Sequence, residues 1–452
     1  MNMGLYIQIH SMHGLFRSRD LELGRDEDSG GQITYVLELA KKLGELDGID
    51  KIDIITRYIS DSEYPGYSQK IEPVSQKVDI VRIKAGPDKY LKKFELWPYI
   101  NDFTENVKTF IKESGRRPDV LHSNFADSGL VCSMLSEELK IPQVHTSHSL
   151  ARPEMEKTGT SEKEIEYLNK TLHFEERMKA EQRIINNAKI IVASTNQEIE
   201  TQYSGYETKG LENKFRVVSP GINPDVFYPP SNINPSPKEG ETFQLLENLI
   251  SQNFKHPEKT LVTTLSRVDR VKNLNNLIRA FAIDKSLSSV ANLAIFGGNL
   301  KSIGKGQPIL DEMNNLIRAS NLYGSVFLYG DFLDYFTQVP AYYRFFSKKR
   351  GIFVNPAFIE PFGLTVIEAG ACGLPVVATK NGGPSEIIND GENGLLVDPE
   401  SPADIAKKIR AVIETPGLWD KLSENGKNNI KKNYTWTMAA KKYFEVFVDA
   451  LK

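Results

Sequence analysis

The sequence predicts an α/β protein with two Rossmann-like domains, each built around a parallel sheet. Short runs of β-branched and apolar residues alternate with stretches of helical periodicity, which is the pattern of parallel strands covered by helices. The runs fall into two series, and a proline-rich segment without periodicity separates them.

The order of the predicted elements gives the domain boundaries. The first series of strands covers residues 5–9, 52–55, 78–83, 120–122, 143–146 and 190–194, and the second covers residues 260–265, 291–296, 325–329, 351–354, 376–378 and 394–397. We therefore expect one domain over residues 1–218, a linker region over 219–258 and a second domain over 259–435. The last helix, within 436–452, is amphipathic, and its pattern alone assigns it to neither domain.

Composition argues against several classes of function. The chain has 452 residues, 40% hydrophobic and 25% charged, and its net charge of −3 gives no attraction for nucleic acid or an anionic membrane. No apolar run reaches the roughly 18 residues of a membrane span, and no basic leader precedes Leu5. Cys132 and Cys372 lie among apolar or small residues, where buried free thiols are expected. We expect a cytoplasmic protein.

Two carboxylates flank a predicted transition from loop to helix. Glu360 belongs to the loop, Pro361 suits a first helical turn, and Glu368 lies two turns into the helix. The pair can point into one cleft and bind sugar hydroxyl groups, because a carboxylate accepts charge-assisted hydrogen bonds. The alternative is that Glu360 caps the helix and Glu368 faces solvent.

Other candidate residues also follow predicted strands. Gly30 and Gly31 start a helix and can bring backbone N–H groups to a phosphate, or they form a plain turn. No Gly-x-Gly-x-x-Gly fingerprint follows any strand, which disfavours a dehydrogenase. Arg267 and Lys272 follow the first strand of the second domain, at the edge where α/β sheets bind ligands, so they are candidates for binding a diphosphate. His148 lies at a strand end too, with a structural role as the alternative.

Six segments resemble the signature blocks of sucrose-phosphate synthases and sucrose synthases. They are residues 21–32 (LELGRDEDSGGQ), 94–99 (FELWPY), 148–150 (HSL), 267–273 (RVDRVKN), 360–368 (EPFGLTVIE) and 381–384 (NGGP). The resemblance covers nearly the whole chain in the family's order. It implies a family-4 retaining glycosyltransferase with a GT-B fold: two facing Rossmann-like domains, a nucleotide sugar on the second and the acceptor on the first. It also implies that the last helix crosses back to the first domain.

The resemblance implies roles for single residues. Glu368 would hold the ribose hydroxyls and Glu360 the donor sugar. The implied catalytic residues are His148, Arg267, Lys272 and Glu360. The implied donor-binding residues are Gly30, Gly31, Arg267, Lys272, Glu360, Phe362, Gly363, Leu364, Thr365 and Glu368. The implied acceptor-binding residues are Gln32, Lys93, Phe125, Ser149, Glu154 and Arg177. In this family the leaving phosphate assists deprotonation of the acceptor, so we expect no metal, no other cofactor and no carboxylate nucleophile.

The acceptor side departs from the family pattern at three positions. Glu154 and Glu176 stand where the family has a lysine and an arginine, and Phe125 stands where it has a tyrosine. Two charge reversals disfavour a phosphorylated acceptor, so we expect an unphosphorylated sugar, polyol or sugar acid. The alternative is that the two glutamates form ion pairs with nearby arginines and that a phosphate site is rebuilt from other basic residues, namely Lys93, Arg152, Lys157 and Arg177.

The expected reaction resembles the synthesis of sucrose or sucrose phosphate, with glucose from UDP-glucose. Transfer from GDP-mannose or ADP-glucose to another sugar, polyol or sugar acid, in compatible-solute synthesis, is an alternative. A non-catalytic sugar-binding protein is the alternative of a different class. Neither oligomeric state nor physiological direction follows from the sequence.

Overall fold

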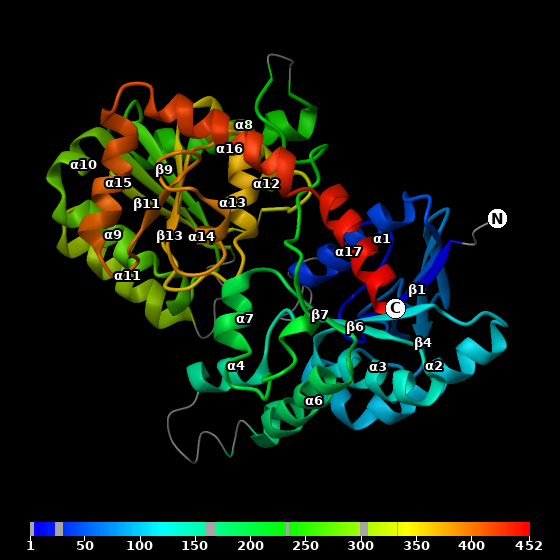
Figure 1. Cartoon of the computed structure of the whole chain (residues 1–452). Helices are drawn as coiled ribbons and strands as arrows, with labels where there is room; N and C mark the ends of the chain where they lie inside the picture. The colour runs from blue at the N-terminus through cyan, green and yellow to red at the C-terminus, as the bar shows by residue number, and fades with distance from the viewer. Residues whose placement is uncertain are drawn as a thin grey trace. The chain divides into compact units, whose positions relative to one another are not determined.

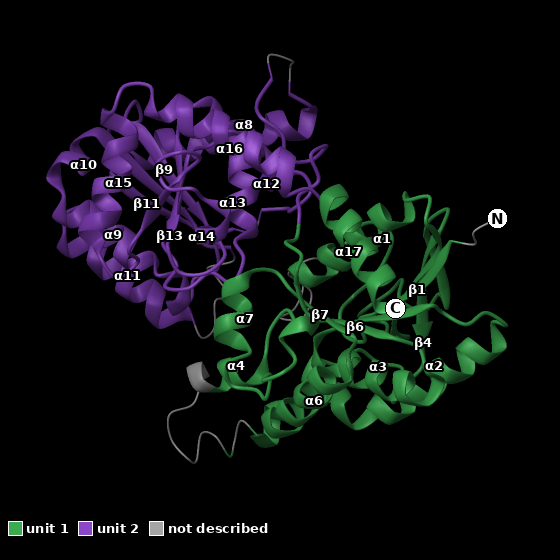
Figure 2. Ribbon diagram, viewed as in Figure 1, with its two compact units in different colours: residues 1–220, 436–452 green, residues 221–435 purple. Residues whose placement is uncertain are grey.

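In the computed structural model the chain forms two compact units (Figure 2). The structure describes residues 4–22, 30–158, 166, 169–231, 235–298, 306–331 and 333–452. Unit 1 runs to Pro220 and includes Trp436–Lys452, whereas unit 2 is Gly221–Thr435. Each unit contains a mainly parallel sheet with helices packed on it (Figure 1), which is the α/β class that the sequence predicts.

Unit 1 contains an eight-stranded sheet with the order β3-β4-β2-β1-β5-β6-β7-β8. Its strands are β1 (Leu5–His10), β2 (Ile49–Arg57), β3 (Ile71–Ser75), β4 (Val78–Ile83), β5 (Val120–Asn124), β6 (Gln143–Thr146), β7 (Ile190–Ala193) and β8 (Phe215–Val217). Neighbours are parallel, except that β3 and β4 are antiparallel. Strands β3 and β8 are not among the predicted strands because they are edge strands without a buried apolar run: β3 contains Pro73, and β8 has three residues.

Helices cover both faces of this sheet and form a separate apolar core on each. The helices of unit 1 are α1 (Gly31–Gly44), η1 (Lys93–Tyr99), α2 (Ile100–Glu113), α3 (Phe125–Leu139), α4 (Ala151–Thr158), α6 (Phe174–Asn187), α7 (Asn196–Gln202), η2 (Glu212–Lys214) and α17 (Trp436–Ala450). Helices α1 and α17 share one core, and α2 and α3 share the other. The hydroxyls of Tyr35 on α1 and Tyr443 on α17 lie 2.7 Å apart, so the last helix is tied into unit 1 by a buried polar contact as well as by apolar packing.

Unit 2 contains a six-stranded parallel sheet with the order β11-β10-β9-β12-β13-β14. Its strands are β9 (Thr260–Leu265), β10 (Ala291–Phe296), β11 (Val326–Tyr329), β12 (Ile352–Asn355), β13 (Val376–Thr379) and β14 (Leu395–Val397). Its helices are α8 (Pro237–Asn253), η3 (Arg270–Lys272), α9 (Leu274–Ile283), α10 (Lys285–Val290), α11 (Gln307–Ala319), α12 (Gln338–Lys348), α13 (Leu364–Ala371), α14 (Pro384–Ile387), α15 (Pro402–Glu414) and α16 (Leu418–Asn433).

The segment expected as a linker, residues 219–258, differs from the prediction because most of it belongs to unit 2. It contains α8, which starts at Pro237 after the Ser236 hydroxyl accepts a hydrogen bond from Glu239 N. The Glu239 carboxylate then pairs with Arg344 Nε of α12 at 2.6 Å. The sequence before residue 237 is rich in proline and has no helical periodicity, which led to the prediction of a linker. Tertiary packing stabilises α8 directly after it.

Two expectations drawn from composition have structural counterparts. Cys132 and Cys372 are buried free thiols, as expected. Within the described ranges, no helix combines the length and the apolar character needed to cross a membrane.

Candidate active site

In unit 2, a lysine and a glutamate from different strand ends form an ion pair. Lys272 ends the short helix η3 after β9, and Asp269 caps that helix by accepting from Lys272 N at 3.0 Å. Lys272 Nζ donates to Glu360 Oε2 at 2.7 Å, and Asn355 Nδ2, at the end of β12, donates to the same oxygen at 3.1 Å. Strands β9 and β12 are parallel neighbours, so their carboxyl ends bring together residues that lie 88 positions apart in the sequence.

The loop that carries Glu360 is held by close backbone contacts with the Asn-Gly-Gly-Pro segment. Glu360 N donates to Asn381 O at 3.1 Å, and Gly383 N donates to Glu360 O at 2.8 Å. Gly382 has φ +101°, and a Cβ on it would lie 2.0 Å from Glu360 O. A side chain at this position would therefore push the Glu360 loop away.

Glu368 is a buried carboxylate on α13, 3% exposed. Tyr335 OH donates to its Oε1 at 2.7 Å, and Tyr343 OH donates to its Oε2 at 3.1 Å. Burial raises the pKa of Glu368 to about 7, against the lowering effect of the two phenol hydrogen bonds. Of the two alternatives, a solvent-facing Glu368 is wrong, and the Glu360 carboxylate binds Lys272 and Asn355 rather than the helix end.

The helix begins later than the sequence suggests. Pro361 was expected in a first helical turn, but α13 starts at Leu364 because Gly363, with φ +103°, turns the backbone into the left-handed region first. Phe362 is buried in the core of unit 2, and Thr365 Oγ1 lies 3.4 Å from Asn355 Nδ2. The segment from 362 to 365 therefore lies directly beside the Lys272–Glu360–Asn355 cluster.

The structure does not bring Arg267 to that cluster. Its side chain is 86% exposed, and its guanidinium lies 3.5 Å from Asp269. Arg270 is likewise 83% exposed, 3.9 Å from Glu312, so it is a solvated surface residue. Lys272 is the basic side chain that this structure places against Glu360.

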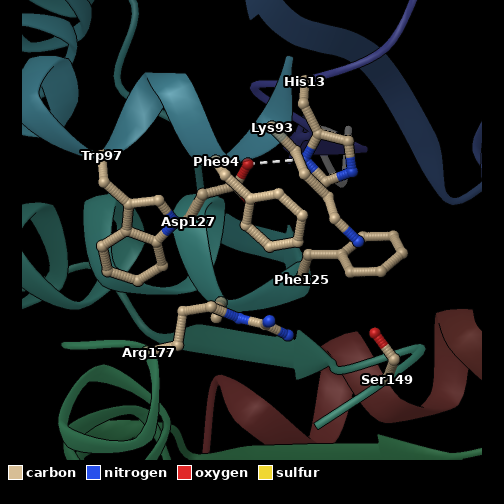
Figure 3. Close-up of a pocket in the computed structure, with 9 residues that line it drawn as sticks. His13, Lys93, Phe94, Trp97, Phe125, Asp127, Ser149 and Arg177 are labelled. Atoms are coloured by element: carbon tan, nitrogen blue, oxygen red, sulfur yellow. Dashed lines mark hydrogen bonds and ion pairs between the residues drawn. The ribbon is translucent and has the colours of Figure 1, made fainter. Parts of the chain in front are cut away.

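Unit 1 contains a pocket with aromatic walls and a polar rim (Figure 3). It lies where η1, the first turn of α3 and the segment after β6 approach α6. Its lining residues are His13, Lys93, Phe94, Trp97, Phe125, Ala126, Asp127, Ser149 and Arg177. The list includes four of the six residues expected to bind the acceptor, namely Lys93, Phe125, Ser149 and Arg177, and the other two contact pocket residues through hydrogen bonds.

His13 and Asp127 form a buried pair in this pocket that sequence reasoning missed. His13 Nδ1 lies 2.5 Å from Asp127 Oδ2, and His13 Nε2 lies 2.8 Å from Gln32 Oε1. Gln32 Nε2 points to His13 O at 3.3 Å, which orients the amide so that its oxygen faces the ring. Both ring nitrogens thus face acceptors, so this geometry suits an imidazolium. The two residues are 114 positions apart, and their only signal is that each follows a strand.

The Asp127 carboxylate is ionised in this arrangement. Burial raises the pKa of Asp127, but the charge and hydrogen bond of His13, with hydrogen bonds from Ser128, outweigh that effect and hold the pKa below its usual value. The pocket therefore contains an ionised carboxylate that is hydrogen-bonded to His13.

His148 is close to the same pocket and is neutral. Its backbone has φ +58°, which is rare outside glycine, and its ring stacks on Phe125 with centroids 4.8 Å apart. Burial lowers the pKa of His148 to about 3, with smaller contributions from neighbouring histidines. Asn124 Nδ2 donates to His10 O at 3.2 Å, so Asn124 Oδ1 accepts from His148 Nε2 at 2.8 Å. Nδ1 of His148 is then the nitrogen that can accept a hydrogen bond.

The two acidic departures from the family pattern have different surroundings. Glu154 Oε2 accepts from Arg177 Nη2 at 2.8 Å, and the Arg177 side chain is only 6% exposed. Glu176 instead pairs with His173 at 2.7 Å and is 62% exposed. Successive helical residues point about 100° apart, so Arg177 lines the pocket while Glu176 faces solvent. The expectation that both reversals act on the acceptor pocket is therefore wrong for Glu176.

Two of the remaining predicted positions lie at the start of α1. Gly31 is the first residue of α1, and the N-cap Gly30 supplies no side-chain hydrogen bond. Asp28 and Ser29, which precede Gly30, lie outside the described residues. The side chain of Lys157, one of the basic residues considered for a phosphate site, also lies outside them. No group of three or more His, Cys, Asp or Glu side chains within the described ranges is arranged to hold a metal ion.

Comparison with known proteins defines the class of both halves. Residues 2–247 match the family model described as sucrose synthase first GT-B domain, and residues 247–429 match glycosyl transferases group 1. The chain is 34% identical to a probable sucrose-phosphate synthase 2 of Arabidopsis thaliana and to a sucrose-phosphate synthase of Spinacia oleracea. Each match covers 97% of this chain and 47% of the relative, so the chain spans about half the length of these relatives.

Solved structures agree with this class. A sucrose-phosphate synthase from Thermosynechococcus elongatus has 25% identity and a TM-score of 0.74, covering 98% of each chain. Anabaena HepE in complex with UDP and glucose has 18% identity and a TM-score of 0.65, covering 98% of this chain and 99% of its own. The fold is that of the GT-B glycosyltransferases. Within that class, the chain belongs to the family described as sucrose synthase first GT-B domain. The relatives that it resembles include sucrose-phosphate synthases.

Proposed function

We propose that this chain is a retaining hexosyltransferase that moves glucose from UDP-glucose to a small, unphosphorylated sugar-type acceptor. The observation that carries the proposal is the cluster of Lys272, Glu360 and Asn355 at the carboxyl ends of β9 and β12. It combines a cation with hydrogen-bonding groups where parallel sheets bind ligands.

The donor half of the proposal rests on complementary charges in unit 2. Lys272 would neutralise the diphosphate, and its release from Glu360 would leave that carboxylate to accept hydrogen bonds from hexose hydroxyls. Glu368 would accept the ribose hydroxyls. Since the cation available for the diphosphate is a lysine, the proposal assigns charge neutralisation to the protein and includes no bound metal or other cofactor.

The acceptor half rests on the pairing of Arg177 with Glu154. A phosphate about 5 Å from the Glu154 carboxylate would be repelled by about 3 kcal/mol per unit charge at an effective dielectric constant of about 20. Glu154 is 33% exposed, so solvent reduces this repulsion. A sugar hydroxyl meets no such repulsion. Arg177 Nη1 is also buried without a hydrogen-bond partner among the described residues, so an acceptor oxygen there would be favourable.

The proposed transfer step uses a neutral His148 and the leaving phosphate. His148, held neutral, would accept a hydrogen bond from a sugar hydroxyl through Nδ1 and would not act as an acid. The acceptor hydroxyl would attack the anomeric carbon from the same face from which the phosphate leaves. An oxygen of the leaving phosphate would take the proton of that hydroxyl. This same-face mechanism gives retention of configuration without a carboxylate nucleophile, and it requires that water be excluded from the donor.

A matrix of nucleotide sugars against acceptors tests the proposal. UDP-glucose, GDP-mannose and ADP-glucose are each combined with fructose, fructose 6-phosphate, glycerol and glucuronate, and nucleotide release is measured. We expect the highest rate with UDP-glucose and an unphosphorylated acceptor, and NMR of the product should show an α-glucosidic bond. Use of the phosphate ester alone would refute the acceptor half. Absence of nucleotide release with every pair would favour a non-catalytic sugar-binding protein.

A further inference from the structure

Glu368 is not accessible to a ligand in this structure. The residue is 3% exposed, and each carboxylate oxygen already accepts a hydrogen bond from a tyrosine. A carboxylate that binds ribose hydroxyls must be reached by them. One of the groups that cover Glu368 therefore has to move before a nucleotide can contact it.

The two tyrosines that cover Glu368 differ in how firmly they are held. Tyr343 lies within α12, is completely buried, and packs its ring against Phe353 with centroids 5.6 Å apart. Tyr335 lies outside regular secondary structure, before the start of α12 at Gln338, and is only half-buried. Moving Tyr343 would open the core of unit 2, whereas the half-buried side chain of Tyr335 can rotate away from Glu368 without opening that core.

The turn that carries Tyr335 is closed by hydrogen bonds between its two flanking residues. Asp334 Oδ1 accepts from Thr337 N at 2.9 Å and from Thr337 Oγ1 at 2.6 Å, so this turn keeps its shape when the Tyr335 side chain rotates. Phe336, next along the chain, is 38% exposed. The ring of Tyr335 lies 5.9 Å from that of Phe227 and 5.3 Å from that of the exposed Phe336.

We propose that the Tyr335 hydroxyl occupies the place of a ribose hydroxyl on Glu368 Oε1 in the empty site, and that nucleotide binding displaces it. The inference rests on the proposed function, in which Glu368 binds the ribose. A phenol and a ribose hydroxyl are both O–H donors to the same carboxylate oxygen, so they compete for it. Tyr335 thereby lowers nucleotide affinity, although its hydroxyl does not contact Glu368 Oε1 once the nucleotide is bound.

Removal of the phenol hydroxyl should strengthen nucleotide binding. In Tyr335→Phe, Glu368 Oε1 no longer accepts a hydrogen bond from the phenol hydroxyl. The ribose can therefore bind Oε1 without first breaking a charge-assisted hydrogen bond. We expect UDP to bind about three- to tenfold more tightly. The measurement belongs at pH 8.5, because the Tyr335 hydrogen bond also lowers the pKa of Glu368, and the carboxylate should be ionised in both proteins.

Titration calorimetry with UDP and with inorganic diphosphate tests the inference. Inorganic diphosphate has no ribose, so its affinity should be equal in wild type and Tyr335→Phe, while UDP affinity increases. Tyr343→Phe is the matched control: it removes the other phenol donor from the same carboxylate but not the mobile cover, so UDP should bind no more tightly than to wild type. Circular dichroism shows whether each variant is folded.

The outcomes separate this inference from the function on which it rests. Equal or weaker UDP binding by a folded Tyr335→Phe variant overturns the displacement, as does an equal gain for inorganic diphosphate. If wild type binds no UDP, GDP or ADP at all, the proposed function fails as well. If wild type binds UDP and Glu368→Gln binds it equally well, the ribose role of Glu368 fails, and the inference fails with it.

Discussion

Arg177 Nη2 and Glu154 Oε2 form an ion pair 2.8 Å long beside the pocket of unit 1. The guanidinium is therefore not available as an unopposed cation for a phosphate. Its central carbon lies 5.4 and 5.2 Å from the ring centroids of Phe94 and Phe174, and these cation–π contacts favour its position beside Glu154. The acceptor preference of the enzyme should thus depend on one carboxylate.

The first prediction concerns that carboxylate. Glu154→Gln should raise the ratio of activity with fructose 6-phosphate to activity with fructose by about tenfold, because it removes the repulsion of the phosphate and frees Arg177. Initial rates of UDP release measure the ratio. Glu176→Gln is the control, since Glu176 pairs with His173 on the surface and its loss should leave the ratio within twofold. Equal effects of both variants would contradict the assignment of Glu154 to the pocket.

The second prediction concerns the cation of unit 2. Lys272→Ala should lower kcat/KM for the donor by about 100- to 1000-fold, because Lys272 is the cation placed to stabilise the leaving diphosphate. The same change at Arg270, whose side chain is 83% exposed, should alter kcat/KM by less than twofold. A small effect of Lys272→Ala together with a large effect of Arg267→Ala would show that the diphosphate binds the exposed Arg267 and not Lys272.

The third prediction is a pH dependence of nucleotide binding. The pKa of Glu368 is raised to about 7, so its carboxylate is largely protonated at pH 6 and ionised at pH 8.5. UDP affinity should increase as the pH rises through about 7 and then level off, since the ionised form accepts the ribose hydroxyls. Glu368→Gln should bind UDP about tenfold more weakly at pH 8.5 and should lose the pH dependence. His148, with a pKa of about 3, should contribute nothing in this range.

The fourth prediction concerns the stability of unit 1. Asp127→Asn should lower the free energy of unfolding by about 3 kcal/mol at pH 7, because it leaves His13 without its buried counter-charge. The folded-state pKa of Asp127 is below its unfolded value, so its stabilisation is present above pH about 4 and is lost as the pH falls through the folded pKa. Urea denaturation should therefore show a smaller difference between the two proteins at pH 3 than at pH 7. A constant difference would contradict an ionised Asp127.

The fifth prediction concerns divalent metal ions. With Lys272 as the cation at the diphosphate, the initial rate should be unchanged within twofold after treatment with a chelator and removal of divalent ions. A loss of activity that added Mg²⁺ or Mn²⁺ restores would show that the metal supplies the charge instead.

The sequence predicts those parts of the site that depend on a local rule. Lys272 and Glu360 are found because each follows a strand, and parallel strands share a carboxyl edge. The pair of His13 and Asp127 is not found, because two isolated residues at distant strand ends carry no common spacing. Glu176 is expected at the pocket only because the resemblance aligns it with a family arginine, and the structure shows that α6 turns Arg177 inward and Glu176 toward solvent.

The course of the chain has a consequence for the order of folding. Unit 2 is an insertion: the chain leaves unit 1 after Pro220 and returns at Trp436, and Ile222 N donates to Tyr434 O at 2.9 Å, which joins the entering and departing segments. The core of unit 1 includes Tyr443 and Phe447 of α17. During synthesis, all of unit 2 is therefore made before unit 1 receives the helix that completes its core. A ribosome-bound chain truncated before α17 should contain a folded unit 2 and an N-terminal unit with exposed apolar surface, open to chaperone binding.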